Sequence, residues 1–159
     1  MINVAINGFG RIGRMVFRAG YKDLNFVAVN DLTDNKSLAH LLKYDSVHNV
    51  LEDDVSFTDN SIVVGKKKIK VFSEKDPRKL PWKKLKVDVV VESTGFFRKP
   101  EDAALHLTAG ARKVVISAPC KCEKTCPLDT TTLVLGVNAD KYDKKKHNAH
   151  QAEQLEIDP

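Results

Sequence analysis

The chain has little of what several classes of protein require. Its 159 residues include only three cysteines, an odd number that does not suit a disulfide framework. No apolar run approaches the roughly 20 residues of a membrane-spanning helix, and the first residues lack the layout of a signal peptide. We therefore expect a cytoplasmic protein without a membrane partner.

Aromatic side chains are also scarce, at 7% of the chain, and this bears on nucleic acid binding. The formal charge of +5 and the pI near 9.1 permit anionic partners. The lysines fall into three local clusters that border apolar segments: Lys66–Lys70, Lys83–Lys86 and Lys144–Lys146. No aromatic residues interleave with these lysines to form a base-stacking surface. We therefore do not expect nucleic acid to be the main partner.

The rest of the composition, 42% hydrophobic and 30% charged, is that of an ordinary globular domain, and the length suits one domain. Apolar segments alternate with helix-like patterns, which is the signal for βαβ units. The later apolar segments are nearly continuous in Val, Ile and Leu, as in a sheet covered on both faces. The predicted strands are Ile2–Ile6, Phe26–Asn30, Val87–Glu92, Lys113–Ser117 and Thr132–Val137, and the predicted helices are Arg11–Tyr21, Ser37–Tyr44 and Pro100–Gly110.

Three glycines follow the first predicted strand and open the first helix, in the sequence Gly8-Phe9-Gly10-Arg11-Ile12-Gly13. In a dinucleotide-binding turn, Gly8 would make the tight bend and Gly10 would let the backbone approach a pyrophosphate. Gly13 would let the helix pack closely on the sheet. The free N–H groups of the helix would then favour the anion.

An acidic residue completes this pattern, because Asp31 follows Gly13 by 18 residues and ends the second predicted strand. A carboxylate there accepts hydrogen bonds from ribose hydroxyls and repels a 2′-phosphate, so the pattern favours NAD over NADP. The alternative is a purely structural turn, with Asp31 capping the next helix. The predicted fold class is α/β, a Rossmann-type, doubly wound and mainly parallel sheet with a small β insertion around residues 55–72.

Beyond these motifs, several segments resemble glyceraldehyde-3-phosphate dehydrogenase, in the order and nearly the spacing of that family. They are Asn7–Arg14, Asn30–Asp34, Lys43–His48, Val91–Gly95, Ile116–Pro119, Gly136–Asn138 and Lys141–Asp143. The resemblance runs from residue 1 to about Asn148 and points to the phosphorylating, NAD-using bacterial type. It implies an NAD-binding domain over residues 1–148, followed by a tail over residues 149–159 that the family does not share.

The resemblance implies a role for each matching position. Backbone amides of Arg11 and Ile12 would face the pyrophosphate, and Lys75 stands where the family commonly has an arginine near the adenine. Without the resemblance, the preferred interpretation of Thr94 and Ser117 is a strand-end cap, and Asn7 is also compatible with a turn former. The full set of candidate cofactor contacts is Asn7, Gly8, Gly10, Arg11, Ile12, Gly13, Asp31, Lys75, Thr94, Gly95 and Ser117, with Thr94 and Gly95 lining the groove and Ser117 near the nicotinamide-side ribose.

The sequence departs from the family where the catalytic residues should be. In the family, a cysteine thiolate in S-C-T-T-N attacks the aldehyde, hydride passes to the nicotinamide, and phosphate cleaves the thioester; a histidine of a second domain is the base. No S-C-T occurs here, although the nucleophile is expected near Leu155. We expect no catalytic residue and an inactive half of the enzyme. A natural truncation, a processed or engineered fragment and a reading-frame break all stay open, and the tail composition is weakly helical.

The cysteines and histidines carry no catalytic prediction. Cys120, Cys122 and Cys126 lack the usual spacing of zinc ligands, so we expect incidental or structural cysteines, with redox sensitivity as a lesser alternative and no metal. His48 belongs to the family-like match. The other histidines are expected on helix surfaces or in the tail: His40, His106, His147 and His150.

The leading interpretation is therefore the NAD-binding domain of a glyceraldehyde-3-phosphate dehydrogenase, a glycolytic oxidoreductase. We expect this domain to be incomplete and inactive alone. The alternative is a non-catalytic module that binds NAD, RNA or other subunits. The expected partners are NAD and either a second copy or full-length subunits. The related erythrose-4-phosphate dehydrogenase is not distinguished, because the residues that read the sugar phosphate lie mostly outside the matched part.

Overall fold

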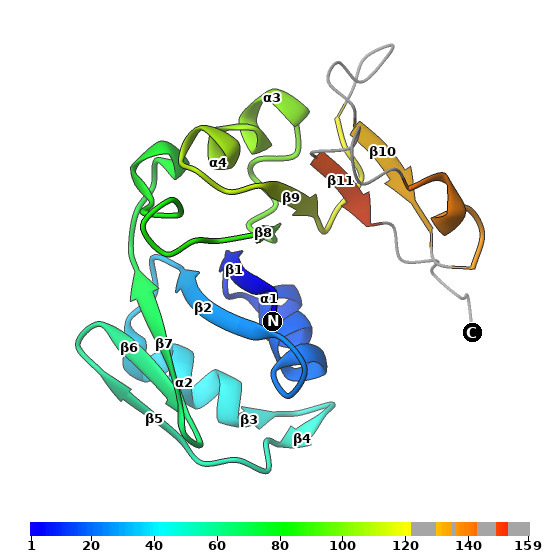
Figure 1. The fold of residues 1–159 in the computed structure, drawn as a ribbon. Helices are drawn as coiled ribbons and strands as arrows, with labels where there is room; N and C mark the ends of the chain where they lie inside the picture. The colour runs from blue at the N-terminus through cyan, green and yellow to red at the C-terminus, as the bar shows by residue number, and fades with distance from the viewer. Residues whose placement is uncertain (122–129, 135, 143–148, 153–159) are drawn as a thin grey trace.

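The computed structural model describes residues 1–121, 130–134, 136–142 and 149–152 (Figure 1). Their main feature is a nine-stranded sheet in the order β10-β11-β9-β8-β1-β2-β7-β6-β5. Neighbouring strands are parallel from β10 across to β7, and β7, β6 and β5 are antiparallel. The strands are β1 (Asn3–Asn7), β2 (Asn25–Asn30), β5 (Val55–Thr58), β6 (Ser61–Val64), β7 (Lys67–Phe72), β8 (Val89–Glu92), β9 (Lys113–Ile116), β10 (Thr130–Leu133) and β11 (Ala149–Ala152).

The predicted α/β class with a mainly parallel sheet is confirmed, and so is the antiparallel insertion around residues 55–72. A separate two-stranded hairpin, β3 and β4, follows the second helix. The remaining elements are α1 (Arg11–Gly20), α2 (Asn35–Lys43), β3 (Tyr44–Asp45), β4 (Asn49–Val50), α3 (Pro100–Ala103), α4 (Leu105–Thr108) and the 3-10 turns η1 (Pro77–Lys79) and η2 (Ala139–Lys141).

Side chains of β1 alternate between the two faces of the sheet, which is why the strand can be covered on both sides. Val4 and Ile6 pack in one apolar cluster with Phe17 of α1 and Leu42 of α2. Ala5 packs on the opposite face, in a second cluster around Trp82. Helices α1 and α2 therefore cover one face, while the segment that holds Trp82 covers the other.

Two predictions about local structure are wrong. The single helix expected over Pro100–Gly110 is divided at Ala104, where ψ is −15° and the Leu107 amide bonds the Ala104 carbonyl in 3-10 fashion, at 2.9 Å. The tail was expected to be weakly helical, but Ala149–Ala152 form β11, parallel to β9 and β10 on its two sides. Ladder hydrogen bonds to two neighbours outweigh a weak helical propensity.

The predicted boundary at residue 148 between a domain and its tail stays a prediction. Within the part of the chain that the structure describes, no helix has the length and apolar character needed to cross a membrane.

Candidate functional site

A groove of about 460 Å³ lies at the carboxyl ends of β1, β2, β7 and β8. From β1 the chain first builds outward through β2 and β7, and then returns to place β8 on the other side of β1. Ligands of open α/β sheets bind at such a reversal of strand order. The groove is lined by Asn7, Gly8, Gly10, Asn30, Asp31, Leu32, Glu74, Lys75, Ser93, Thr94, Phe96 and Phe97.

A larger hollow of about 900 Å³ lies between α2 and β5, at the antiparallel edge. None of the eleven candidate residues lines it. The groove is the better candidate because six of those residues meet there.

Two glycines of the turn are required by packing, and the third leaves space. Gly8 has a φ of +89°, and a Cβ added there would lie 2.6 Å from the Thr94 amide nitrogen. A Cβ on Gly13 would lie 2.2 Å from the Gly8 carbonyl oxygen. A Cβ on Gly10 would meet no atom within 4 Å, although Gly10 borders the groove. The open side of the turn therefore faces the groove at Gly10.

Helix α1 begins directly behind this space. Its N-cap is Gly10, which has no side chain to accept a hydrogen bond from the first turn. The first N–H groups of a helix have no partner within the helix and carry the positive end of its dipole. The start of α1 therefore suits an anionic group such as a pyrophosphate.

Asp31 lies at the end of β2, beside the glycine turn. One carboxylate oxygen accepts a hydrogen bond from the Phe9 amide at 2.7 Å, and the other accepts one from the Thr33 amide at 2.9 Å. The alternative role of Asp31 as the cap of the next helix is wrong. Asp34 is the N-cap of α2, where it accepts a hydrogen bond from the Ser37 amide.

The remaining candidates divide into groove residues and their neighbours. Lys75 and Thr94 line the groove, and Gly95 follows with a φ of +76°. Ser117 lies at the end of β9, where its hydroxyl donates to the Glu92 carbonyl at 3.1 Å, and it does not line the groove. The contacts of Ser117 are therefore those of a strand-end cap.

The side chains of Arg11 and Ile12 do not line the groove either. Arg11 lies 3.6 Å from the Asp45 carboxylate, and Ile12 is 44% exposed. The roles expected for these two residues concern their backbone amides, which belong to the first turn of α1.

Several groove residues were missed by sequence reasoning. Phe96 is 86% exposed and Phe97 lies next to it, so two aromatic rings border the groove. An adjacent Phe-Phe pair in a chain with few aromatics was the available signal. Ser93, whose hydroxyl donates to the Gly8 carbonyl at 2.6 Å, gave no such signal, because its partner is 85 residues away.

Comparison with known proteins agrees with this geometry. The sequence model described as "Glyceraldehyde 3-phosphate dehydrogenase, NAD binding domain" matches residues 2–100. The chain belongs to the glyceraldehyde-3-phosphate dehydrogenase family. Its matched part is the NAD-binding domain, and NAD is the cofactor of that domain.

Similar proteins include the glyceraldehyde-3-phosphate dehydrogenases of Geobacillus stearothermophilus, at 58% identity, and of Thermotoga maritima, at 57%. Glyceraldehyde-3-phosphate dehydrogenase 1 of Bacillus subtilis is 56% identical. Each comparison covers 92% of this chain but only 43% of the relative. The chain thus spans less than half the length of these members of the glyceraldehyde-3-phosphate dehydrogenase family.

A buried polar cluster lies directly behind the groove of this domain. The carboxylate of Glu92 is joined to Asn7 and to His106, and all three residues are at most 2% exposed. The expectation that His106 lies on a helix surface is wrong, because it is fully buried and bonded to Trp82 and Glu92. His40, in contrast, is exposed on α2 as expected.

The surroundings of Arg14 and Cys120 shift the pKa values of these two side chains. Burial, together with the neighbouring Arg11, lowers the pKa of Arg14, whose guanidinium donates to the Phe9 carbonyl at 2.9 Å. Burial also raises the pKa of the Cys120 thiol, which opposes the redox alternative at that residue. Cys122 and Cys126 lie outside the described residues, so the cysteine motif as a whole stays a prediction.

Proposed function

We propose that this chain supplies the dinucleotide-binding half of a phosphorylating glyceraldehyde-3-phosphate dehydrogenase, with NAD lying in the groove described above. One observation carries the proposal. The start of α1 at Gly10, which has no side-chain cap, and the carboxylate of Asp31 lie at the same edge of the sheet and border one groove. That arrangement supplies separate sites for a pyrophosphate and for a ribose diol.

In this proposal the turn binds the pyrophosphate through the backbone amides of Arg11 and Ile12. Asp31 accepts hydrogen bonds from the adenosine ribose, since each of its oxygens has lone pairs beyond the one used in the turn. Lys75 borders the adenine side. These assignments are supported by the common groove and by the family, in which the matched segment is the NAD-binding domain.

On the nicotinamide side, we assign Thr94 and Gly95 to the wall of the groove and Ser117 to the neighbouring ribose. Bound NAD supplies a two-electron acceptor for hydride from an aldehyde substrate. The residues of this chain bind and orient the dinucleotide. We assign neither the nucleophilic thiol nor the general base of the family's reaction to any of them.

We further propose that the β3–β4 hairpin associates with a second copy of the chain. Tyr44, Val47 and Val50 are each more than half exposed there, and apolar groups gathered on one short hairpin favour a protein contact. Light scattering should detect an oligomer that Val47→Lys dissociates. A wild-type monomer at high concentration would contradict this part of the proposal.

Titration calorimetry with NAD and NADP tests the cofactor assignment. Asp31→Ala should weaken NAD binding by about tenfold, because hydrogen bonds to a charged acceptor are lost. Asp31→Asn keeps one acceptor oxygen but removes the charge, so the preference for NAD over NADP should fall. Asp59→Ala, at the exposed turn between β5 and β6, is the charge-matched control. Unchanged NAD affinity in both Asp31 variants would contradict the assignment.

A further inference from the structure

The buried polar cluster joins the two walls of the groove. Asn7 ends β1 and lines the groove on one side of the chain reversal, and Thr94 lines it just beyond the end of β8. Glu92 lies between them and contacts both. The residue is 2% exposed, so solvent does not share in holding these contacts.

Four donors surround the Glu92 carboxylate. Oε1 accepts hydrogen bonds from the Thr94 amide, at 2.8 Å, and from the Thr94 hydroxyl. Oε2 accepts from Asn7 Nδ2 at 2.6 Å and lies 3.0 Å from His106 Nε2. A buried carboxylate is costly unless its oxygens are paired in this way. The two oxygens therefore bond to different walls of the groove. Oε1 bonds to Thr94, after β8, and Oε2 bonds to Asn7, at the end of β1.

The orientation of the His106 ring follows from its other nitrogen. The indole N–H of Trp82 donates to His106 Nδ1 at 2.9 Å, and an indole nitrogen is only a donor. Nδ1 must therefore accept, and the hydrogen-bond network assigns the ring hydrogen to Nε2, which faces Glu92. The ring thus presents a donor to the carboxylate.

Asn7 is fixed in the same manner. Its Oδ1 accepts a hydrogen bond from Asn30 Nδ2 at 2.7 Å, so its Nδ2 points toward Glu92. Asn30 is in turn held by two backbone bonds of 2.8 Å with Glu74, which borders the groove. A continuous chain of hydrogen bonds therefore runs from Glu74 through Asn30, Asn7 and Glu92 to His106.

We propose that Glu92 is a positioning residue for the cofactor groove: its carboxylate fixes the orientation of Asn7 and Thr94 at the groove, and His106 and Trp82 fix the orientation of that carboxylate. This inference rests on the proposed binding of NAD in the groove. Glu92 does not line the groove itself, so it acts through Asn7 and Thr94.

The first test is Glu92→Gln in the 159-residue chain, with calorimetric titration of NAD and urea unfolding in parallel. A glutamine still offers an oxygen to Thr94, but its amide group then directs hydrogens at Asn7 and His106, which are both donors. We expect NAD to bind about tenfold more weakly to the folded variant. Ile62→Val, on β6 and in the apolar core, is a matched control that lowers stability without changing NAD affinity.

A second pair of variants leaves the carboxylate untouched and covers the case in which Glu92→Gln does not fold. His106→Gln keeps a donor for Glu92 and an acceptor for Trp82, so NAD affinity should stay within about twofold of wild type. His106→Leu removes both, and affinity should fall several-fold. A merely structural role would change the unfolding transition of both variants without separating their NAD affinities.

The outcomes separate the two proposals. If the folded wild-type chain does not bind NAD, the proposed function fails. If the wild type binds NAD and a folded Glu92→Gln or His106→Leu variant binds it equally well, the positioning role of Glu92 is overturned while the proposed function stands.

Discussion

The domain has two buried regions of opposite character. Under α1 and α2 lies an apolar cluster in which Phe17 packs against the rings of Phe9, Tyr21 and Phe26, at centroid distances of 4.9–5.8 Å. Behind the groove lies the polar cluster centred on Glu92. Burial of apolar area stabilises a fold but does not fix the orientation of individual side chains. Hydrogen bonds do fix that orientation, although each contributes little net free energy to stability. The first region should therefore govern stability and the second should govern the groove.

The largest effect that we predict tests the apolar side of this comparison. Leu42 on α2 is fully buried, so Leu42→Ala should lower the free energy of unfolding by about 2–5 kcal/mol, from lost burial and the cavity left behind. Urea unfolding followed by circular dichroism measures this change. NAD affinity of the folded variant should equal that of wild type, and a tenfold loss would remove the distinction between the two regions.

A smaller loss of stability is expected where a polar group supports the apolar half. The Arg18 guanidinium donates to the carbonyls of Leu42, Lys43, His48 and Asn49, and so joins the end of α2 to the β3–β4 hairpin. Arg18→Met should cost about 2 kcal/mol in urea unfolding, because the partly buried carbonyls of Leu42 and Lys43 lose a charged donor. Arg18→Lys should cost less, and an equal cost would contradict the importance of the multiple bonds.

Substitutions at two of the three glycines of the turn distinguish an effect on packing from an effect on NAD binding. Gly10→Ala adds a methyl group into open space, so the free energy of unfolding should change by less than about 1 kcal/mol, while NAD affinity should fall by about tenfold. Gly8→Ala should impair both, since its Cβ would strike the Thr94 backbone at a positive φ. Unfolding and calorimetry of both variants provide the check. Unchanged NAD affinity in Gly10→Ala would place the pyrophosphate elsewhere.

The smallest effect concerns a carboxylate that belongs to neither of these two buried regions. Backbone amides of His48 and Val47 hold the pKa of Asp45 below its ordinary value of 3.8. A lowered pKa in the folded state means that the stabilisation is present above the unfolded value and is lost as the pH falls through the folded value. Asp45→Asn should therefore make the stability of the chain less sensitive to pH below about 4. Identical acid-unfolding curves would contradict this.

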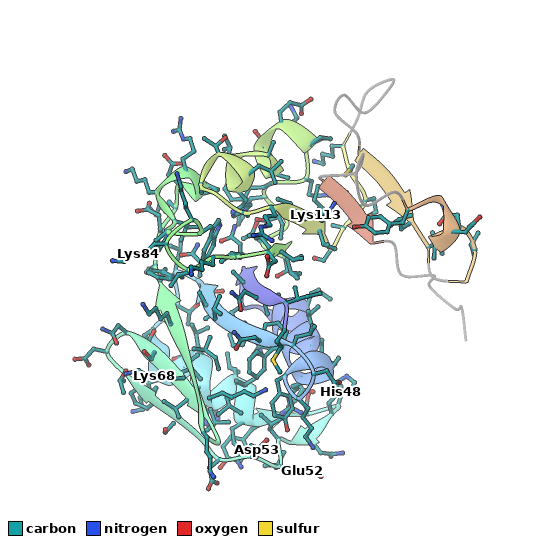
Figure 2. The ribbon with its side chains drawn as sticks, in the orientation of Figure 1. His48, Glu52, Asp53, Lys68, Lys84 and Lys113 are labelled. Carbon is teal, nitrogen blue, oxygen red and sulfur yellow. The ribbon has the colours of Figure 1, made fainter. Side chains whose placement is uncertain are left out.

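Three surface lysines come from different parts of the chain. Figure 2 shows Lys68 on β7, Lys84 before β8 and Lys113 at the start of β9, well apart from one another. These three lysines do not lie together in this view, and the expectation that nucleic acid is not the main partner stays a prediction.

The sequence predicted the elements and the turn well because both depend on neighbours along the chain. The apolar spacing of α1 and the order Gly8, Gly10, Gly13 need no distant partner to be interpreted. His106 was misplaced for the opposite reason. Its partners Trp82 and Glu92 come from other segments, 24 and 14 residues away, and nothing local distinguishes a buried histidine from an exposed one.

The same limit applies to the groove and to the last strand. Asn7 meets Glu92 across 85 residues, so their hydrogen bond follows only from the pairing of β1 with β8. Residues Ala149–Ala152 become a strand because β9 and β10 lie on both sides of them, and their own propensities do not indicate it. Where tertiary contacts decide a structure, local pattern carries no signal.

The most direct test of the central claim is a map of backbone amide NMR shifts during titration of the chain with NAD. The account predicts that the perturbed amides gather at Gly8–Gly13, at Asp31 and Lys75, and at Ser93–Phe97, along one edge of the parallel sheet. Perturbations confined to the hollow between α2 and β5, or none at saturating NAD in a folded chain, would contradict it.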